Sequence, residues 1–180
     1  MPGRGSALRR QRRGWIHRQN CGSCAAAEIG GSGNLQVEAA GVGGARATDP
    51  ATKERLETRL KKGIRDRRWP LVRAVVLILG INDAGKGISA QAISTALEGL
   101  KQTALAADGC DRVFVCTMYH ETYLEDQIYA VVNASIIGME DVEVVDLGFG
   151  IELAADGVHP SKDGYQQIAG AISAAFVAQA

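Results

Sequence analysis

The stretch VVLILGINDAGKGIS, residues 75–89, joins an apolar run to a polar, glycine-rich segment that has two incompatible interpretations. Val75 to Leu79 is continuously apolar, as expected of a parallel strand that is buried on both faces. The residues that follow form either a Gly-x4-Gly-Lys motif that resembles a phosphate-binding loop, or a Gly80-x-Asn82-Asp83 motif in which the asparagine amide is the important group. Other parts of the chain must decide between the two.

A phosphate-binding loop needs glycines for backbone contact, a lysine for the phosphate oxygens, and a Ser or Thr directly after that lysine for magnesium. Here Lys86 is followed by Gly87, and Ser89 comes two residues too late. The nucleotide-binding interpretation therefore rests on an incomplete motif. A third alternative is a plain loop after a buried strand, with Asn82 and Asp83 making local turn hydrogen bonds.

The bulk composition predicts one domain and a ligand of low charge. The chain has 180 residues, with 20 Lys and Arg balanced by 20 Asp and Glu. Such a balance projects no strong field toward nucleic acid, anionic membranes or highly charged substrates. The basic residues are nevertheless unevenly distributed along the chain, because residues 1–27 contain six arginines and no acidic residue.

Membrane, export and metal-binding functions find no support in the sequence. No apolar run approaches the roughly 20 residues that span a bilayer, and no apolar segment of a signal peptide follows the N-terminal arginines, which favours a cytoplasmic location. The cysteine pairs Cys21-x2-Cys24 and Cys110-x5-Cys116 lack histidines at zinc-site spacing. We therefore expect no metal and no cofactor, and a buried, reduced thiol at Cys116.

From about residue 35 onward, short β-rich runs alternate with amphipathic segments, which predicts an α/β domain with a parallel sheet. Residues 35–180 form this domain, and the Arg- and Gly-rich residues 1–34 form an irregular basic segment. Strands are predicted at 35–38, 74–79, 112–117 and 143–147.

Four helices are predicted between and after these strands. Asp49 caps the first, with Pro50 at its first position, and Ser89 caps the second. The predicted buried faces consist of Leu56, Leu60 and Ile64; Ile93, Leu97, Leu100 and Ala104; Leu124, Ile128 and Val131; and Ile168, Ile172 and Phe176.

Two further segments carry candidate chemistry. In ADGVHPSKDGY, Asp156 and His159 lie three residues apart just before a helix, so that the carboxylate can fix the tautomer of the imidazole. In EAAGVGGARATD, Gly44 follows the first predicted strand, and a residue without a Cβ allows a backbone N–H to approach a ligand closely. His17 and His120 have no such companion and are interpreted as ordinary residues.

Together, the order and spacing of AGVGGARATD, LGIND and DGVHP resemble the SGNH, or GDSL-type, esterases and lipases over residues 35–177. Blocks of that family include a glycine after the second strand, Gly-x-Asn-Asp after the third, and Asp-x-x-His before the last helix. The resemblance implies a three-layer α/β/α sandwich with a flavodoxin-like parallel sheet. It also implies a serine esterase that cleaves small acyl esters.

The resemblance assigns a role to each matching residue. The Gly44 N–H and the Asn82 amide would bind the developing oxyanion, a contact typically worth about 3 to 4 kcal/mol in the transition state. His159 would act as general base and then acid, and Asp156 would orient it. Substrate would bind over the carboxyl ends of the parallel strands.

One block of the family is not found, namely an apolar strand that ends in Gly-Asp-Ser and supplies the nucleophile. By its distance from Gly44, Ser6 is the candidate, although it lacks the preceding strand and aspartate; Ser23 and Ser32 are alternatives. Three hypotheses follow. The first strand and nucleophile are missing because the start is misread or truncated, or Ser6 acts in an unusual context, or the chain is an inactive binding module with the same fold.

Overall fold

The computed structural model describes residues 39–65, 74–119, 127–148 and 150–178, and the side chains of residues 62–65 are not described. Within these ranges, parallel strands pair in the order β1 (Ala74–Leu77), β2 (Arg112–Cys116) and β3 (Glu143–Val145). In register, Leu77 lies opposite Val115, and Cys116 lies opposite Val145. The strand predicted at residues 35–38 lies outside the described residues.

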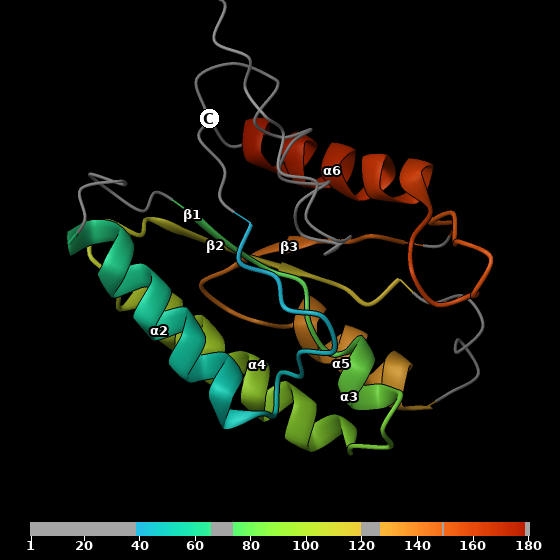
Figure 1. The fold of residues 1–180 in the computed structure, drawn as a ribbon, viewed down its shortest axis with the longest axis horizontal. Coiled ribbons are helices and arrows are strands. Elements are labelled where there is room, and N and C mark those ends of the chain that lie inside the picture. Colours follow the sequence, from blue (N-terminus) through green and yellow to red (C-terminus); the bar gives the residue numbers. More distant parts are fainter. Residues whose placement is uncertain (1–38, 66–73, 120–126, 149, 179–180) are drawn as a thin grey trace, which may run out of the picture.

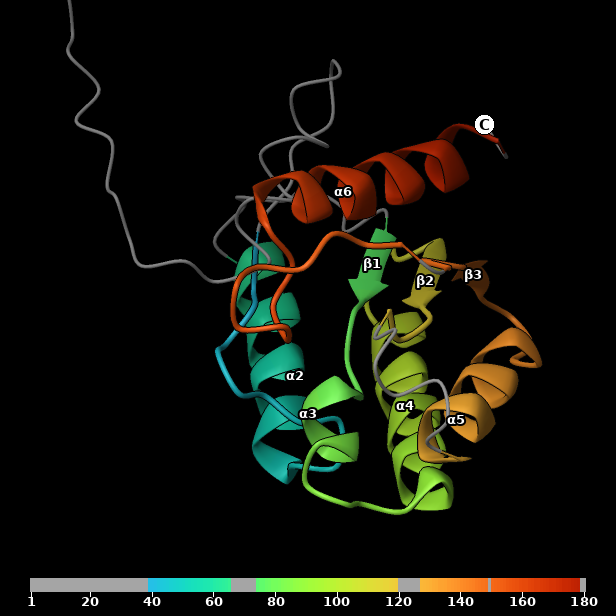
Figure 2. The same ribbon diagram turned by 90° about the vertical axis from the view of Figure 1, so that its right-hand side faces the viewer.

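Helices cover both faces of this sheet. They are α2 (Pro50–Arg65), α3 (Ile81–Ala84), α4 (Ala90–Leu105), α5 (Gln127–Ile137) and α6 (Lys162–Val177). Figure 1 shows α2, α4 and α5 on one side of the sheet and α6 on the other, and the turned view in Figure 2 shows the same separation. The predicted three-layer α/β architecture is confirmed.

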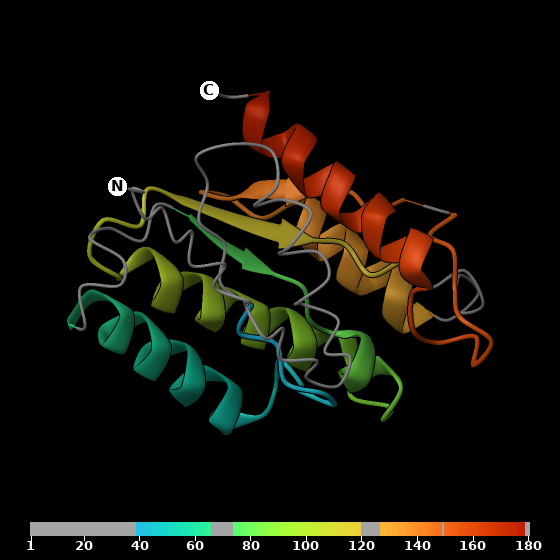
Figure 3. The same cartoon turned by 45° about the horizontal axis from the view of Figure 1, so that its top comes forward.

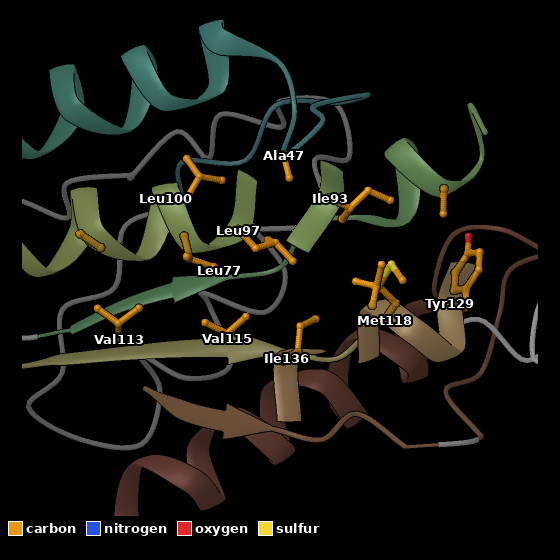
Figure 4. Close-up of a cluster of buried hydrophobic side chains, with 13 residues drawn as sticks. Ala47, Leu77, Ile93, Leu97, Leu100, Val113, Val115, Met118, Tyr129 and Ile136 are labelled. Carbon is orange, nitrogen blue, oxygen red and sulfur yellow. The ribbon is translucent and has the colours of Figure 1, made fainter. Parts of the chain in front are cut away.

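Strand β2 divides the hydrophobic core into two clusters, because successive side chains of a strand point to opposite faces. Val113 and Val115 face the cluster under α4 and α5, which Figure 4 shows with Leu77, Leu97 and Ile136 around them. Phe114 and Cys116 face the cluster under α6. Cys116 is a free, buried thiol as predicted, and burial raises its pKa to about 12.

The predicted start signals of two helices are confirmed. The Ala51 N–H donates to Asp49 Oδ1 at 3.0 Å at the start of α2, and the Ala92 N–H donates to Ser89 Oγ at 3.3 Å at the start of α4. These bonds satisfy backbone donors that a helix cannot pair internally. The predicted face of α4, from Ile93 to Ala104, is buried.

The predicted buried face of α5 is wrong at Val131, which is 53% exposed. Tyr129, Val132 and Ile136 form the buried stripe instead. The stripe is rotated by one residue, about 100° around the helix, and this rotation places the Tyr129 ring and Ile136 in the cluster that contains Met118. Leu124, from which the predicted face started, lies outside the described residues.

Strand β1 is less buried than its apolar sequence predicts. Only Leu77 of its residues is fully buried, whereas Val113 to Cys116 of β2 are all buried. The reason is position, since β1 pairs with β2 alone among the described strands. Both β1 and β3 also end two residues earlier than predicted.

Arg112, at the start of β2, fixes the far end of α6 to the sheet. Its guanidinium pairs with Glu143 on β3 and donates to the carbonyl oxygen of Phe176 at 3.1 Å. It also lies against two aromatic rings, 4.7 Å from the centroid of Phe114 and 4.6 Å from that of Phe176. The ion pair raises the pKa of Arg112, and its contact with α6 helps to orient the helix that follows the predicted histidine motif.

Candidate active site

The predicted site residues come from segments that lie at one end of the sheet. Helix α3 follows the carboxyl end of β1, and the loop of residues 150–161 precedes α6. Figures 1 and 3 show α3 and this loop at the same end of the molecule, the end toward which β1 and β2 run. Ligands of open α/β sheets bind at the carboxyl ends of the strands.

Gly44 lies in a tight turn whose geometry favours glycine. The Ala45 N–H donates to the Val42 carbonyl at 3.1 Å, and Gly44 has a φ of 72°. A positive φ at the third position is the geometry of a type II turn, for which glycine is preferred. The hydrogen bond of the turn does not use the Gly44 N–H, which belongs to its central peptide, and Gly44 is exposed.

Asn82 binds the same segment from α3. Its Nδ2 donates to the Ala45 carbonyl at 2.9 Å. Because only the amide nitrogen can donate to a carbonyl, this contact fixes which way the amide points. An amide nitrogen carries two protons, and the bond to Ala45 uses one of them. The structure thus brings Asn82 beside the Gly44 turn.

Asp83 is a residue whose role the sequence interpretation missed. It is fully buried, and its Oδ2 accepts the Ala47 N–H at 2.7 Å. Its Oδ1 accepts the Thr48 N–H at 3.0 Å and the Thr48 hydroxyl at 2.6 Å. The sequence assigned it only local turn bonds, whereas its partners lie 35 and 36 residues away. The available signals were a short polar side chain beside Asn82 and its place as the last residue of the Gly-x-Asn-Asp block.

The segment from Gly80 to Gly87 does not form a phosphate-binding loop. Such a loop presents unpaired backbone N–H groups to the phosphates. Here the amides of five successive residues all donate to backbone carbonyls in and around α3, namely Ala84, Gly85, Lys86, Gly87 and Ile88. The Ser89 hydroxyl caps α4. The nucleotide interpretation is therefore not supported.

Gly80 makes the change of direction from β1 into α3. Its φ is 109°, and a Cβ there would lie 2.9 Å from Met118 Sδ. Met118 is itself fixed to α5, since Asn133 accepts its N–H at 2.8 Å and donates to its carbonyl at 3.0 Å. The Gly80 backbone, directly before α3, thus packs closely against Met118, which follows β2.

Asp156 and His159 form the predicted carboxylate–imidazole pair. The distance between Asp156 Oδ2 and His159 Nδ1 is 2.7 Å, and the side chains are 52% and 65% exposed. Asp156 Oδ1 also accepts the backbone N–H groups of Val158 at 2.9 Å and His159 at 3.0 Å. With Nδ1 bound to the carboxylate, Nε2 is the ring nitrogen left for proton transfer.

The same hydrogen bonds lower the pKa of Asp156 well below its usual range. The backbone N–H of His159 contributes most, followed by the N–H of Val158 and the imidazole. A lowered folded-state pKa stabilises the loop above the unfolded value of about 3.9. That contribution is lost only as the pH falls through the lower folded-state value, so the carboxylate remains ionised at any near-neutral pH.

The loop that carries this pair is closed at its base. The Ala154 N–H donates to the His159 carbonyl at 2.7 Å, and the Ser161 N–H donates to the Glu152 carbonyl at 2.8 Å. The Ser161 hydroxyl also donates to Glu152 Oε1 at 2.7 Å. Gly164, in the first turn of α6, packs against this base and is buried. These hydrogen bonds between the two ends of the loop therefore fix the backbone of His159.

Gly164→Ala is expected to lower the free energy of unfolding by about 1 to 3 kcal/mol, the usual cost of overpacking. An added Cβ would lie 2.1 Å from the Glu152 carbonyl oxygen and 3.1 Å from Pro160 Cβ, so the base of the loop must move. Urea unfolding measures the effect. The control is Gly170→Ala in the same helix, where an added Cβ meets nothing within 4 Å. Equal stabilities of the two variants would contradict the prediction.

The predicted nucleophile Ser6, its alternatives Ser23 and Ser32, and His17 and His120 lie outside the described residues. Within the described ranges, no cluster of three or more His, Cys, Asp or Glu side chains is arranged to hold a metal ion. No helix in those ranges has the length and apolar character to cross a membrane.

Solved structures with a similar fold include two esterases. A carbohydrate esterase family 3 protein from Talaromyces cellulolyticus is 23% identical and superposes with a TM-score of 0.62, covering 81% of this chain and 72% of the other. An acetyl esterase, solved as a mutant with acetate ion, is also 23% identical and has a TM-score of 0.57, with coverage of 76% and 68%. At this identity the likeness establishes the fold alone. No curated protein sequence matches the chain.

The sequence itself matches a family model over residues 12–167. This range contains Gly44, Asn82, Asp156 and His159, and it starts after Ser6. The match spans most of the chain, and the parallel sheet and its helices agree with the fold of the two esterases. The chain belongs to the GDSL-like lipase/acylhydrolase family.

Proposed function

We propose that this acylhydrolase-family chain is a carboxylic ester hydrolase that cleaves small acyl esters. In the proposal, His159 is the general base and acid, Asp156 orients it, and Gly44 and Asn82 form the oxyanion hole. The observation that carries the proposal is the 2.7 Å contact between Asp156 Oδ2 and His159 Nδ1. This contact selects the tautomer in which Nε2 accepts a proton.

In the acylation step, a serine Oγ attacks the carbonyl carbon of the ester while its proton passes to His159 Nε2. The imidazolium that forms is stabilised by the ionised Asp156. The negative charge that develops on the carbonyl oxygen is bound by the Gly44 N–H and the second Nδ2–H of Asn82. The tetrahedral intermediate then expels the alkoxide, which takes the proton from His159 and leaves as the alcohol.

In the deacylation step, water replaces the serine as the nucleophile. His159 Nε2 removes one proton from the water as its oxygen attacks the acyl carbon. The same two donors bind the second oxyanion. Collapse of this intermediate returns the proton to the serine Oγ and releases the carboxylic acid, which regenerates the starting state.

The nucleophile is proposed to be Ser6, with Ser23 and Ser32 as the alternatives that the experiment must separate. Ser6 precedes the range of the family match, whereas Ser23 and Ser32 lie within it. Acetyl esters are the first substrates to test, since the similar structures are named as a carbohydrate esterase and an acetyl esterase.

A fluorophosphonate that labels activated serines tests both the reaction class and the nucleophile. We expect one adduct in the wild-type chain, mapped by peptide mass spectrometry, and its loss in only one of Ser6→Ala, Ser23→Ala and Ser32→Ala. The same variant should lose at least about 100-fold in p-nitrophenyl acetate hydrolysis. Absence of any adduct on a folded chain would reject serine catalysis and favour a binding module.

A further inference from the structure

We infer that Asp83 is a positioning residue for the oxyanion hole, which it serves by holding the loop of residues 42–48 against α3. The inference rests on the proposed function, because it explains how Gly44 is kept in place beside Asn82. Asp83 touches no reacting atom in this scheme. Its carboxylate is fully buried, and the proposed mechanism does not use it.

The contacts of Asp83 are those of a fixed anchor. Three donors from two adjacent residues, Ala47 and Thr48, converge on its two oxygens at 2.6 to 3.0 Å. Hydrogen bonds to an ionised acceptor are short and strong compared with neutral ones. The loop backbone thereby satisfies a charge that would otherwise be costly to bury.

Asp83 is itself held rigidly. Its carbonyl accepts the Lys86 N–H at 3.0 Å and the Ile88 N–H at 3.1 Å, which closes the chain around α3. Gly80, three residues earlier, packs closely against Met118, which follows β2. Asp83 therefore holds the loop of residues 42–48 in a fixed place relative to the end of the sheet.

The consequence for Gly44 follows from the geometry of the loop. Two successive turns, closed by Ala45 N–H to Val42 O at 3.1 Å and Asp49 N–H to Arg46 O at 3.3 Å, connect Gly44 to the anchored residues. Neighbouring residues of one helical turn thus hold the loop at two points, Asn82 at Ala45 and Asp83 at Ala47 and Thr48. The separation of the two proposed oxyanion donors depends on both contacts.

Asp83→Asn tests this role because an amide has one acceptor oxygen and turns its NH₂ toward a backbone donor. We expect kcat for p-nitrophenyl acetate to fall about 10- to 100-fold with KM changed less than about threefold, as for a misplaced transition-state contact. Asp146→Asn is the matched control. Asp146 Oδ1 also accepts a threonine hydroxyl, from Thr117 at 3.0 Å, and a backbone N–H, from Gly148 at 2.9 Å, but outside this loop. It should keep the wild-type kcat.

Amide hydrogen exchange by NMR gives a readout that needs no activity. In the wild type we expect protected amides at Ala47 and Thr48. In Asp83→Asn we expect these two to lose protection and the Gly44 signal to shift, while Val113 and Val115 in β2 stay protected. A structural role confined to general stability would lower protection in β2 as well.

The outcomes separate the two proposals. Wild-type kcat in a folded Asp83→Asn chain overturns the positioning role and leaves the esterase intact. If the wild-type chain shows no esterase activity, the exchange pattern decides, and unchanged Ala47 and Thr48 protection overturns the role. If Asp83→Asn does not fold, Thr48→Val replaces it, because this variant removes only the hydroxyl contact with Asp83. We expect its kcat to fall roughly threefold. An unchanged kcat in Thr48→Val overturns the inference.

Discussion

His159→Ala is expected to lower kcat for p-nitrophenyl acetate by about 10²- to 10⁴-fold, the usual contribution of a positioned general base and acid. The imidazole is bound by Asp156 at Nδ1 and is 65% exposed, so its removal leaves no cavity in the core. The free energy of unfolding should therefore change little. Stopped assays at equal enzyme concentration, with urea unfolding of both proteins, measure the two effects.

Asp156→Asn is the companion variant that separates orientation from loop structure. Asparagine Oδ1 can still accept the N–H groups of Val158 and His159, which keep the turn. Its NH₂, however, donates to Nδ1 and selects the opposite tautomer, in which Nε2 carries the proton. We expect kcat to fall toward the His159→Ala level while the loop persists. Wild-type rates in either folded variant would exclude the proposed pair from catalysis.

Asn82→Ala is expected to lower kcat by about 10²- to 10³-fold, the range for removal of one oxyanion donor. The substitution deletes the second Nδ2–H and also the bond to the Ala45 carbonyl. KM should change less than kcat, because the lost contact is strongest in the transition state. Steady-state kinetics over a range of substrate concentrations provide both constants.

Asn133→Ala is the matched control for Asn82→Ala. Asn133 also bonds the backbone with its amide group, donating to the Met118 carbonyl at 3.0 Å and accepting the Met118 N–H at 2.8 Å, but it takes no part in the proposed reaction. Its loss should lower the free energy of unfolding by about 1 to 3 kcal/mol and leave kcat close to wild type below the unfolding transition. Equal kcat losses in the two variants would attribute the Asn82 effect to stability.

The elements that local chemistry determines could be predicted from the sequence. The caps at Asp49 and Ser89 and the buried face of α4 follow from short-range rules, and the structure has them. The Asp156–His159 contact belongs to the same class, because both partners lie within one turn. The predicted roles of these two residues in catalysis stay predictions.

What the sequence did not predict depends on contacts between distant segments. Asp83 looked like a turn residue, and only the folded chain brings Ala47 and Thr48 to its carboxylate. Val131 fits a helical stripe, but packing against the Met118 cluster selects the stripe one residue further on. The need for glycine at position 164 likewise comes from the Glu152 carbonyl, which only the tertiary fold places there.

The sheltered Arg112–Glu143 pair has a consequence for the solvents in which the fold persists. Their side chains are only 21% and 16% exposed, whereas those of the helix-surface pair Lys61 and Glu57 are 80% and 40% exposed. Dissolved ions screen exposed charges strongly and partly buried ones much less. Concentrated salt should therefore weaken the Lys61–Glu57 attraction and leave Arg112 between its two rings. We therefore expect α6, and with it the His159 loop, to stay attached to the sheet at high ionic strength.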